Sequence, residues 1–329
     1  MKVDTHSHAI PQGIMDLYHA QPMEYNFRLQ TAADGSLEMI GKSGIVTPLR
    51  KGFYDVPARL ADMDARGVDA ELVTPSPTTV FYDWPLEKAL PFMQTLNDGI
   101  AEMCREAPDR LFPAASLPMQ DVDASCEELK RVVKQYGIRM VMLNTSVNGL
   151  FYDDPSFFPL FSLCEELDVM VFIHPQSVKP GPGLEKYYLI NLLGNPIDST
   201  ISAARLVLGG AMKQFPGCRF YFAHGGGCLP YQRGRVEHGY DKRKEPRVNL
   251  GEDELAPYFD RLYFDTITHS PKALAFLISS HGADHVLLGS DYPFDMADMR
   301  SPEEILALEG LDSEEKEQIF SANIMSLLK

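Results

Sequence analysis

The sequence is poor in several features that define large classes of proteins. Its five cysteines are odd in number, scattered and free of any CxxC pair, so neither a disulfide framework nor a cysteine-rich zinc site is indicated. No run approaches the roughly 18 apolar residues that a membrane-spanning helix needs. No repeat of fixed period and no low-complexity tract occurs. These absences favour a soluble protein of a reducing, cytoplasmic compartment without a membrane partner.

Positive charge is also scarce. The chain has 30 Lys and Arg against 46 Asp and Glu, a formal net charge of -16. A phosphate-binding surface needs a clustered excess of Lys and Arg, so nucleic acid is not an expected partner. Hydrophobic residues make up 45% and charged residues 23% of the 329 positions, which is the ordinary composition of a globular protein that is large enough for one α/β barrel.

Short apolar runs alternate along the chain with longer stretches of helical periodicity. This alternation is typical of βα units around a parallel sheet. Eight runs are predicted as strands, at residues 2–5, 70–74, 112–117, 139–143, 169–173, 219–223, 261–264 and 285–289. The fold class is therefore expected to be α/β, a (β/α)₈ TIM barrel.

Helices are predicted between these strands, at residues 56–66, 86–106, 124–136, 157–166, 199–215, 271–280 and 302–308, with a closing helix at 313–327. Asp55 and Asp123 are expected to cap two of them, and Ser301 with Glu304 reads as a capping box. Two connections are too long for plain loops, and such segments are usually lids or binding segments. We therefore expect one domain over residues 1–329, with an insertion at about 9–54 and a second long loop at 175–196.

A pair of histidines lies at the end of the first predicted strand, in His6-Ser7-His8. Side chains alternate along a strand with a period of two, so both imidazoles would face the same side. The pair could hold a metal ion, or it could simply face solvent.

Three further residues make the metal interpretation much stronger. His174 ends the fifth predicted strand, His224 ends the sixth, and Asp291 follows the eighth. Every strand of a parallel barrel opens its C-terminal end onto the same face, so these side chains should converge with the histidine pair. Imidazoles and a carboxylate suit zinc, or manganese or iron, better than calcium or magnesium. Strand four ends in Asn144-Thr145, which offers no bridging ligand for a second ion, so one Zn²⁺ with an open position for water is expected.

At this point the sequence resembles the amidohydrolase superfamily of metal-dependent hydrolase-type barrels, in particular its aminocarboxymuconate semialdehyde decarboxylase branch. The likeness runs nearly end to end. It is carried by MKVDTHSH (1–8), ADMD (61–64), LPMQ (117–120), FIHP (172–175), FAHGGG (222–227), Gly234-Arg235, His238-Gly239 and GSDYPF (289–294).

The resemblance implies roles for the converging residues. His6, His8, His174 and Asp291 would bind the metal, and His224 would act as an acid/base group on the metal-bound water or the substrate. Histidine suits that task because its unperturbed pKa is about 6.5. His224 could instead be a core residue or a fifth ligand.

The resemblance also points to substrate-binding residues. Arg235 and Arg243 match the region that holds substrate carboxylates in the decarboxylases, and by analogy they reach into a neighbouring subunit, which implies a functional homodimer. They could equally be surface arginines. His269, after strand seven, is a further candidate for the pocket wall.

The pattern departs from the family elsewhere in the pocket. The segment that supplies another arginine in the decarboxylase reads Val46-Thr47-Pro48, and the aromatic stretch after strand five reads KYYLIN (186–191). An aromatic wall from Phe81, Trp84, Tyr187 and Tyr188 remains a hypothesis, with core packing as its alternative.

The expected function is metal-dependent non-oxidative decarboxylation of a small unsaturated or aromatic carboxylate, with His224 or Asp291 moving the proton. A hydrolase or hydratase acting on a lactone, an amide or a double bond is the alternative, because activated water would serve those reactions equally well. A metal-binding regulatory protein without turnover is a third hypothesis.

Overall fold

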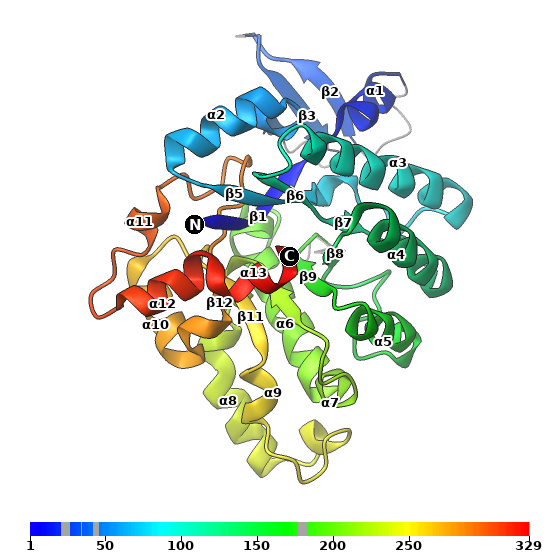
Figure 1. Cartoon of the computed structure of the whole chain (residues 1–329). Coiled ribbons are helices and arrows are strands. Elements are labelled where there is room, and N and C mark those ends of the chain that lie inside the picture. Colours follow the sequence, from blue (N-terminus) through cyan, green and yellow to red (C-terminus); the bar gives the residue numbers. More distant parts are fainter. Residues whose placement is uncertain (21–26, 34, 42–45, 177–182, 329) are drawn as a thin grey trace.

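The structure is a computed structural model that describes residues 1–20, 27–33, 35–41, 46–176 and 183–328. Parallel strands form a ring at its centre and helices surround them, so the predicted (β/α)₈ barrel is confirmed (Figure 1). The strands of the ring are β1(Val3–Ala9), β5(Ala70–Pro75), β6(Leu111–Pro113), β7(Ala115–Ser116), β8(Met140–Asn144), β9(Met170–His174), β10(Phe220–Phe222), β11(Leu262–Asp265) and β12(Val286–Leu287).

Two hydrogen-bonded sheets make up the ring, in the orders β1-β5-β6 and β12-β11-β10-β9-β8-β7. The ring closes where β1 meets the chain after β12: the Thr5 amide donates to the Leu288 carbonyl at 2.8 Å, and the His8 amide donates to the Tyr292 carbonyl at 2.7 Å. The run predicted as one strand at 112–117 is two short strands. Pro113 lies at this break, where it lacks the amide that a continuous ladder requires.

The helices pack outside the ring, as expected for strands that are apolar on both faces. They are α2(Val56–Arg66), α3(Leu86–Arg105), α4(Val122–Tyr136), α5(Phe158–Glu166), α6(Asn195–Leu208), α7(Ala211–Gln214), α8(Leu229–Lys242), α9(Ala256–Phe259), α10(Pro271–His281), α11(Pro302–Ile305), α12(Ser313–Glu317) and α13(Asn323–Leu328). Every residue of β8 and β9 is buried, and these two strands lie in the larger of two hydrophobic clusters.

Several helix predictions need correction. The helix predicted at 199–215 starts earlier, at Asn195, and breaks at Gly209-Gly210, because Gly210 has a left-handed φ of 86°. The closing helix contains a π-helical turn, Gln318–Ala322, between α12 and α13. Helix α8 was not predicted at all, since only Leu229, Pro230 and Tyr240 are buried along it and the apolar periodicity is weak.

The predicted helix starts are right in two of three places. The Asp55 side chain accepts a hydrogen bond from the Ala58 amide, and Ser301 with Glu304 forms the capping box. Asp123 was the wrong residue for α4: Asp121 caps that helix by accepting from the Ala124 amide, because the helix begins at Val122 and places Asp123 inside its first turn.

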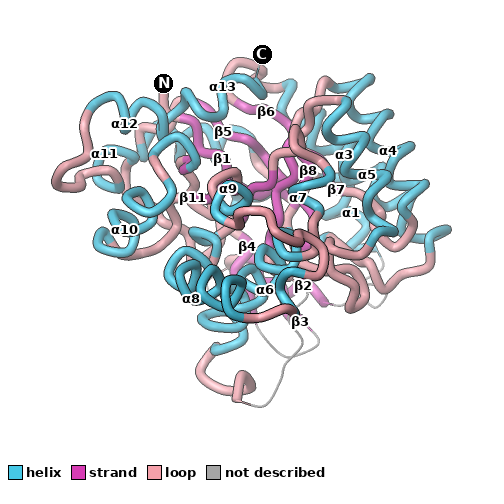
Figure 2. The backbone as a smooth tube through the Cα atoms, turned by 90° about the horizontal axis from the view of Figure 1, so that it is seen from below, coloured by secondary structure: helices cyan, strands magenta, loops and turns pink. Residues whose placement is uncertain are grey.

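The insertion after β1 has its own secondary structure. It contains α1(Gln12–Ala20) and an antiparallel sheet of β2(Phe27–Thr31), β3(Leu37–Gly41) and β4(Val46–Leu49). Figure 2 places this sheet at the end of the barrel opposite the two termini. The segment 177–182 of the second long loop lies outside the described residues, and a π-helical turn, Ile190–Gly194, leads from that loop into α6.

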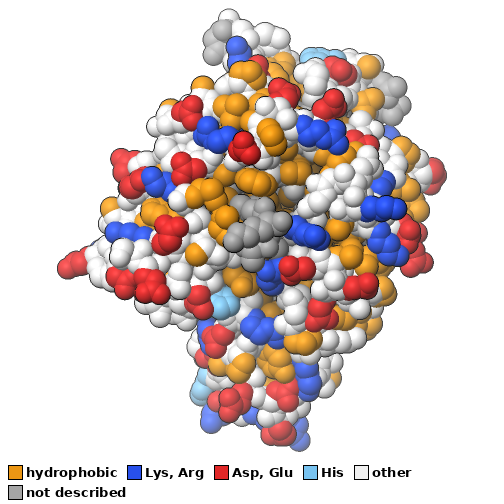
Figure 3. Space-filling model, viewed as in Figure 1, with side chains coloured by type: hydrophobic (Ala, Val, Ile, Leu, Met, Phe, Trp, Pro, Cys, Tyr) orange, Lys and Arg blue, Asp and Glu red, His pale blue; other side chains and the backbone are white. Residues whose placement is uncertain are grey.

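The surface of the face seen in Figure 1 mixes both charge signs, with acidic and basic side chains interspersed (Figure 3). In the part of the chain that the structure describes, no helix combines the length and the apolar character needed to span a membrane.

Candidate metal centre and active site

Four side chains converge at the C-terminal end of the barrel. His6 and His8 come from β1, His174 ends β9 and Asp291 follows β12; their ligand atoms all lie within 4.8 Å of one another, and all four residues are buried. The Nε2 atoms of His6 and His8 are 3.1 Å apart. Asp291 Oδ1 lies 3.4 Å from the first of these nitrogens and 3.1 Å from the second.

The backbone explains this convergence. His6 and His8 are two positions apart on β1, so their side chains lie on the same side of the strand; the pairing with β5 has a register shift between Asp4 and Ser7. Asp291 has a left-handed φ of 66°, and its amide donates to the His6 carbonyl at 2.8 Å, which holds the segment after β12 against β1.

Each histidine of the group presents Nε2 to the site because Nδ1 is engaged elsewhere. His6 Nδ1 donates to Asp265 Oδ2 at 2.7 Å, and His174 Nδ1 donates to the Pro175 carbonyl at 3.1 Å. His8 Nδ1 lies 2.8 Å from the hydroxyl of Thr74, which itself donates to a backbone carbonyl and so accepts from the ring. The unprotonated Nε2 atoms therefore all point inward, as metal-binding imidazoles do.

This geometry fits a divalent cation. Two Nε2 lone pairs at 3.1 Å cannot hydrogen-bond to each other, and His174 Nε2 and Asp291 Oδ1 are buried without a hydrogen-bond partner. Tetrahedral zinc with Zn–N bonds of about 2.0–2.1 Å would separate two nitrogens by about 3.3 Å. The arrangement is thus a His/Asp metal site, and its donors suit a transition-type ion.

Electrostatics agrees with this assignment. Burial lowers the pKa of His8 to about 4 and holds the pKa of His174 well below its usual value, so both rings are neutral and could bind a metal ion. Burial would raise the pKa of Asp291, but the neighbouring imidazoles of His224, His6 and His8 hold it well below its usual range. Burial alone would lower the pKa of His6, yet its hydrogen bond to Asp265 and the nearby carboxylate of Asp291 raise it to about 9. The two carboxylates thus favour a positive charge here, which a bound cation would supply in place of a proton.

Asp265, at the end of β11, is a site residue that the sequence reasoning missed. It is fully buried, and besides His6 it accepts from the backbone amides of His224 at 2.8 Å, Gly225 at 2.8 Å and Ile267 at 3.0 Å. One carboxylate thus fixes a metal ligand and the turn that carries His224. Its position at a strand end, like the other site residues, was the signal that could have identified it.

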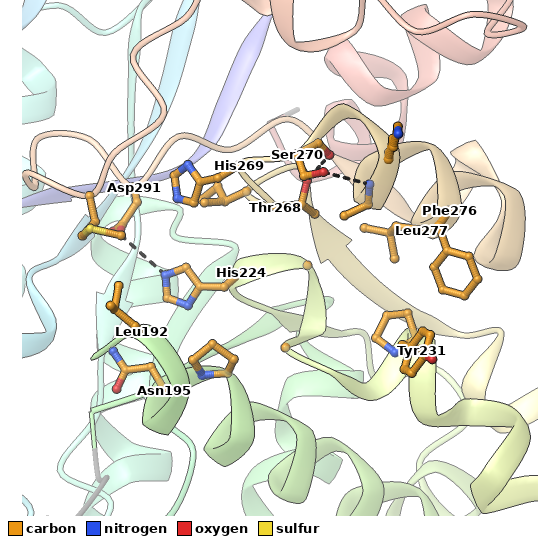
Figure 4. Close-up of a pocket in the computed structure, with 18 of the residues that line it drawn as sticks. Leu192, Asn195, His224, Tyr231, Thr268, His269, Ser270, Phe276, Leu277 and Asp291 are labelled. Atoms are coloured by element: carbon orange, nitrogen blue, oxygen red, sulfur yellow. Dashed lines mark hydrogen bonds and ion pairs between the residues drawn. The ribbon is translucent and has the colours of Figure 1, made fainter. Parts of the chain in front are cut away.

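His224 opens a short glycine-rich turn after β10 and faces a cavity. Its Nε2 lies 3.5 Å from Asp291 Oδ2, and its side chain is 18% exposed (Figure 4). The turn needs glycine, because a Cβ at Gly226 would overlap the ring of Phe264 and one at Gly227 would overlap the Pro196 carbonyl.

Two cavities meet at His224 and Asp291. The larger, about 710 Å³, extends between α8 and α10, and its walls include His269, Lys272 and Phe276 (Figure 4). The smaller, about 290 Å³, lies over the metal site. Residues from several loops, from β4 and from the start of α6 line it: Thr47, Pro77, Thr78, His174, Pro175, Gln176, Tyr188, Ile190, Asn191, Asn195, Phe294, Asp295 and Met296.

The predicted substrate residues separate into two groups. His269 lines the larger cavity, but Arg235 on α8 and Arg243 just after it are exposed and line neither cavity. Arg243 instead pairs with Glu245. Of the described residues in the two walls, Lys272 is the only Lys or Arg, and no pattern in the sequence singled it out.

The predicted aromatic wall is only partly present. Phe81 and Trp84 stack at 4.2 Å and pack into the smaller hydrophobic cluster, so core packing accounts for both. Tyr188 lines the smaller cavity, whereas Tyr187 is 84% exposed.

Comparison with known proteins places this geometry in a family. The chain is 29% identical over 328 residues to 2-amino-3-carboxymuconate-6-semialdehyde decarboxylase of Dictyostelium discoideum, covering 100% of this chain and 91% of the relative. It is 30% identical to γ-resorcylate decarboxylase of Rhizobium sp. (strain MTP-10005), covering 74% of this chain and 78% of the relative. A dihydroxybenzoic acid decarboxylase of Polaromonas sp. JS666, solved with bound manganese and 2-nitroresorcinol, shares the fold with a TM-score of 0.80 and 22% identity, covering 99% and 96% of the two chains. The amidohydrolase family model matches residues 3–329, and the chain belongs to the amidohydrolase family.

Proposed function

We propose that the chain is a metal-dependent non-oxidative decarboxylase that acts on an unsaturated or aromatic carboxylate. The observation that carries the proposal is the pair His224 and Asp291: Asp291 belongs to the buried metal-binding group, and both residues line the two open cavities. The two relatives compared above are decarboxylases, which supports the same reaction class.

We propose one zinc ion as the resident metal, held by His6, His8, His174 and Asp291. Three neutral imidazoles and a carboxylate favour zinc, and manganese or iron remains the alternative. When bound, the ion would offset the charge of the substrate carboxylate and orient it.

His224 or Asp291 moves the proton. Decarboxylation needs a proton at the carbon that bears the carboxylate; the C–C bond then breaks, its electron pair returns to the unsaturated system, and CO₂ leaves. His224 Nε2 lies 3.5 Å from Asp291 Oδ2 and its side chain opens onto the cavity, so the pair can pass a proton toward a bound substrate.

The larger cavity has the character expected for an aromatic or conjugated substrate. Its apolar walls come from Ile267, Leu277 and Phe276, which can enclose a flat hydrocarbon body. His269 and Lys272 contribute polar atoms at the same cavity and can orient a second polar group of the substrate.

We also propose a homodimer in which Arg235 or Arg243 reaches the partner's site. Both arginines are exposed and remote from their own cavities. Apolar side chains are exposed around the mouth of the larger cavity, including Ile197, Tyr231 and Phe276, and such a patch is typical of an interface. Light scattering checks the dimer. A second experiment mixes two inactive proteins, the double variant R235A/R243A and the single variant H224A. Activity should return, because each mixed dimer contains one complete site. A mixture that stays inactive would contradict the shared site.

The reducing cytoplasm remains our proposed compartment. The five cysteines are all free, and three of them, Cys104, Cys164 and Cys218, are buried as thiols.

Elemental analysis combined with a mass-spectrometric screen of aromatic and muconate-type acids tests the function. About one metal per chain with loss of CO₂ is expected. Gain of water instead would move the chain to the hydratase or hydrolase alternative. A protein fully loaded with metal that turns over none of these acids would favour the regulatory hypothesis, and a protein that binds no metal would overturn the proposal.

A further inference from the structure

Two arginines of α2 are buried beside the metal site, although neither lines the two cavities that meet there. Arg59 is 0% and Arg66 is 5% exposed. Glu71 of β5 lies between them and bridges the two guanidinium groups: its Oε2 accepts from Arg59 at 2.5 Å, and its Oε1 accepts from Arg66 at 2.7 Å. Buried charges are costly unless paired, so this arrangement needs all of its members.

Arg59 forms hydrogen bonds with the strand that carries the histidine pair. Its Nη1 donates at 3.1 Å to the hydroxyl of Ser7, the residue between His6 and His8, and its Nη2 donates to the His8 carbonyl. Its Nε donates to the Gly52 carbonyl at 3.0 Å. The planar fork of arginine can make these bonds in three directions at once, which lysine cannot.

Arg66 forms hydrogen bonds with the segment that carries Asp291. Its Nη1 donates to the Ser290 hydroxyl at 3.1 Å and to Asp4 Oδ2 at 3.3 Å. The Ser290 amide donates to Asp4 Oδ1 at 3.1 Å, and the Ser290 hydroxyl also bonds to Asp4. The residue immediately before Asp291 is therefore tied to the start of β1 and to α2.

The ring of Tyr292 joins the two halves of this network. The guanidinium carbons of Arg59 and Arg66 lie 5.1 Å and 4.5 Å from its centroid, and its hydroxyl donates to Asp62 at 2.6 Å. Residues on both sides of the seam that closes the barrel thus meet the same pair of arginines.

We infer that Arg59 and Arg66 are positioning residues that set the coordination geometry of the metal centre without touching the ion. They hold the backbone of three of the four ligands, His6, His8 and Asp291, through direct contacts with Ser7, the His8 carbonyl and Ser290. The inference rests on the metal centre proposed above. It predicts that removing a few hydrogen bonds of this network changes the coordination of the ion in addition to lowering the stability of the fold.

The test compares R59K and R66K with the wild type in two measurements that need no substrate. One is the visible absorption spectrum of the Co²⁺-substituted protein, which reports coordination geometry. The other is the rate at which the Zn²⁺ protein loses its ion to an excess of chelator. S7A and S290A are included because each removes the hydroxyl that contacts one arginine, together with that hydroxyl's other hydrogen bonds, with little change in volume. They keep the test available if a lysine variant fails to fold.

The matched control is R131K. Arg131 pairs with Glu128 and Asp98 between α3 and α4, and its replacement loses charge-assisted bonds that do not involve the ligands. We expect altered Co²⁺ spectra and about tenfold faster metal loss in the α2 and serine variants, with both properties unchanged in R131K.

The outcomes separate the two proposals. Variants that melt at lower temperature but keep the wild-type spectrum and wild-type metal-loss rate would overturn the positioning role and leave the metal centre intact. A wild-type protein that takes up neither Co²⁺ nor Zn²⁺ would instead overturn the proposed function on which this inference depends.

Discussion

Asp265 accepts four hydrogen bonds, one from the ring of His6 and three from backbone amides that include that of His224. An amide in its place would keep the shape but lose the charge, and one of its two polar atoms would become a donor facing other donors. We expect D265N to weaken metal binding by about 10- to 100-fold. Competition with a chromogenic chelator measures this, and D121N, which keeps a capping oxygen on α4, is the control. Equal metal affinities in D265N and wild type would contradict the role.

His224 should matter for turnover and not for holding the ion. We expect H224N to lower kcat by about 10²- to 10⁴-fold with wild-type metal content, because a positioned acid/base group contributes on that order. H269N is the control: His269 lines the larger cavity but forms no ion pair with Asp291, so KM should change more than kcat. Loss of the ion from H224N would assign His224 to the ligands instead.

The sequence was informative about this site because strand-end positions share one face of a barrel. Alternation along β1 and the ends of β9 and β10 were enough to predict that His6, His8, His174 and His224 would meet. Asp265 ends a strand too, yet its carboxylate is hydrogen-bonded to His6 and to backbone amides and is not one of the four grouped residues. Nothing in a single sequence distinguishes a carboxylate that orients a ligand from one that is a ligand. Arg235 and Arg243 were selected by resemblance alone, and a single chain cannot test a role in its partner.

At the scale of elements, α4 offers a direct comparison of two aspartates. Asp121 accepts from the Ala124 amide, whereas Asp123 lies within the first turn. We expect D121A to lower the free energy of unfolding by about 1 kcal/mol and D123A by only a few tenths, through loss of its favourable interaction with the helix dipole. Urea unfolding of both variants measures the difference, and equal losses would show that the cap is unimportant.

The C-terminal end of α10 carries a histidine that should make the fold sensitive to acid. Burial lowers the pKa of His281 to about 4, with further lowering by the charges of Arg233 and His285 against the opposing effect of Asp260. The folded state therefore favours the neutral ring. The stabilisation is complete above the unfolded pKa of about 6.5 and is lost as pH falls toward 4.

Replacing this ring with an apolar side chain should flatten the pH dependence. Between pH 7.5 and 5 we expect wild type to lose about 2 kcal/mol more stability than H281L, measured by urea unfolding of chelator-treated protein. H19L is the control, since His19 on α1 is exposed. Parallel profiles for wild type and H281L would contradict this prediction.

The elements that the sequence failed to predict have a common cause. Helix α8 buries three residues and the small sheet β2-β3-β4 stands on the barrel's C-terminal end, so neither shows the full apolar periodicity of a core element. The barrel strands were predicted well because most of their residues are buried on both faces and they are bounded by turn residues. The break at Pro113 could have been predicted from the sequence, because proline has no amide hydrogen to donate to the hydrogen-bond ladder of a sheet.

For the whole molecule, the ligands connect the first strand of the barrel, the middle of the ring and the segment after its last strand. An ion bound there stabilises the folded state and not the unfolded state, because only folding brings the four side chains together. We expect removal of the metal to lower the melting temperature by roughly 5–10 °C, as measured by calorimetry with and without chelator. In H174A the chelator should have little effect, because one ligand is already absent. A wild-type melting temperature insensitive to the chelator would contradict a resident ion.

The distance in sequence between the ligands has a consequence for how the protein is made. Asp4 and Ser290, which brace the two ends of the site, are 286 positions apart. A ribosome must therefore release nearly the entire polypeptide before the last ligand can join the first. A product that ends before Asp291 cannot hold the ion with this set of four side chains, so metal content in the cell should report how much of the protein was synthesised past that residue and closed into a ring.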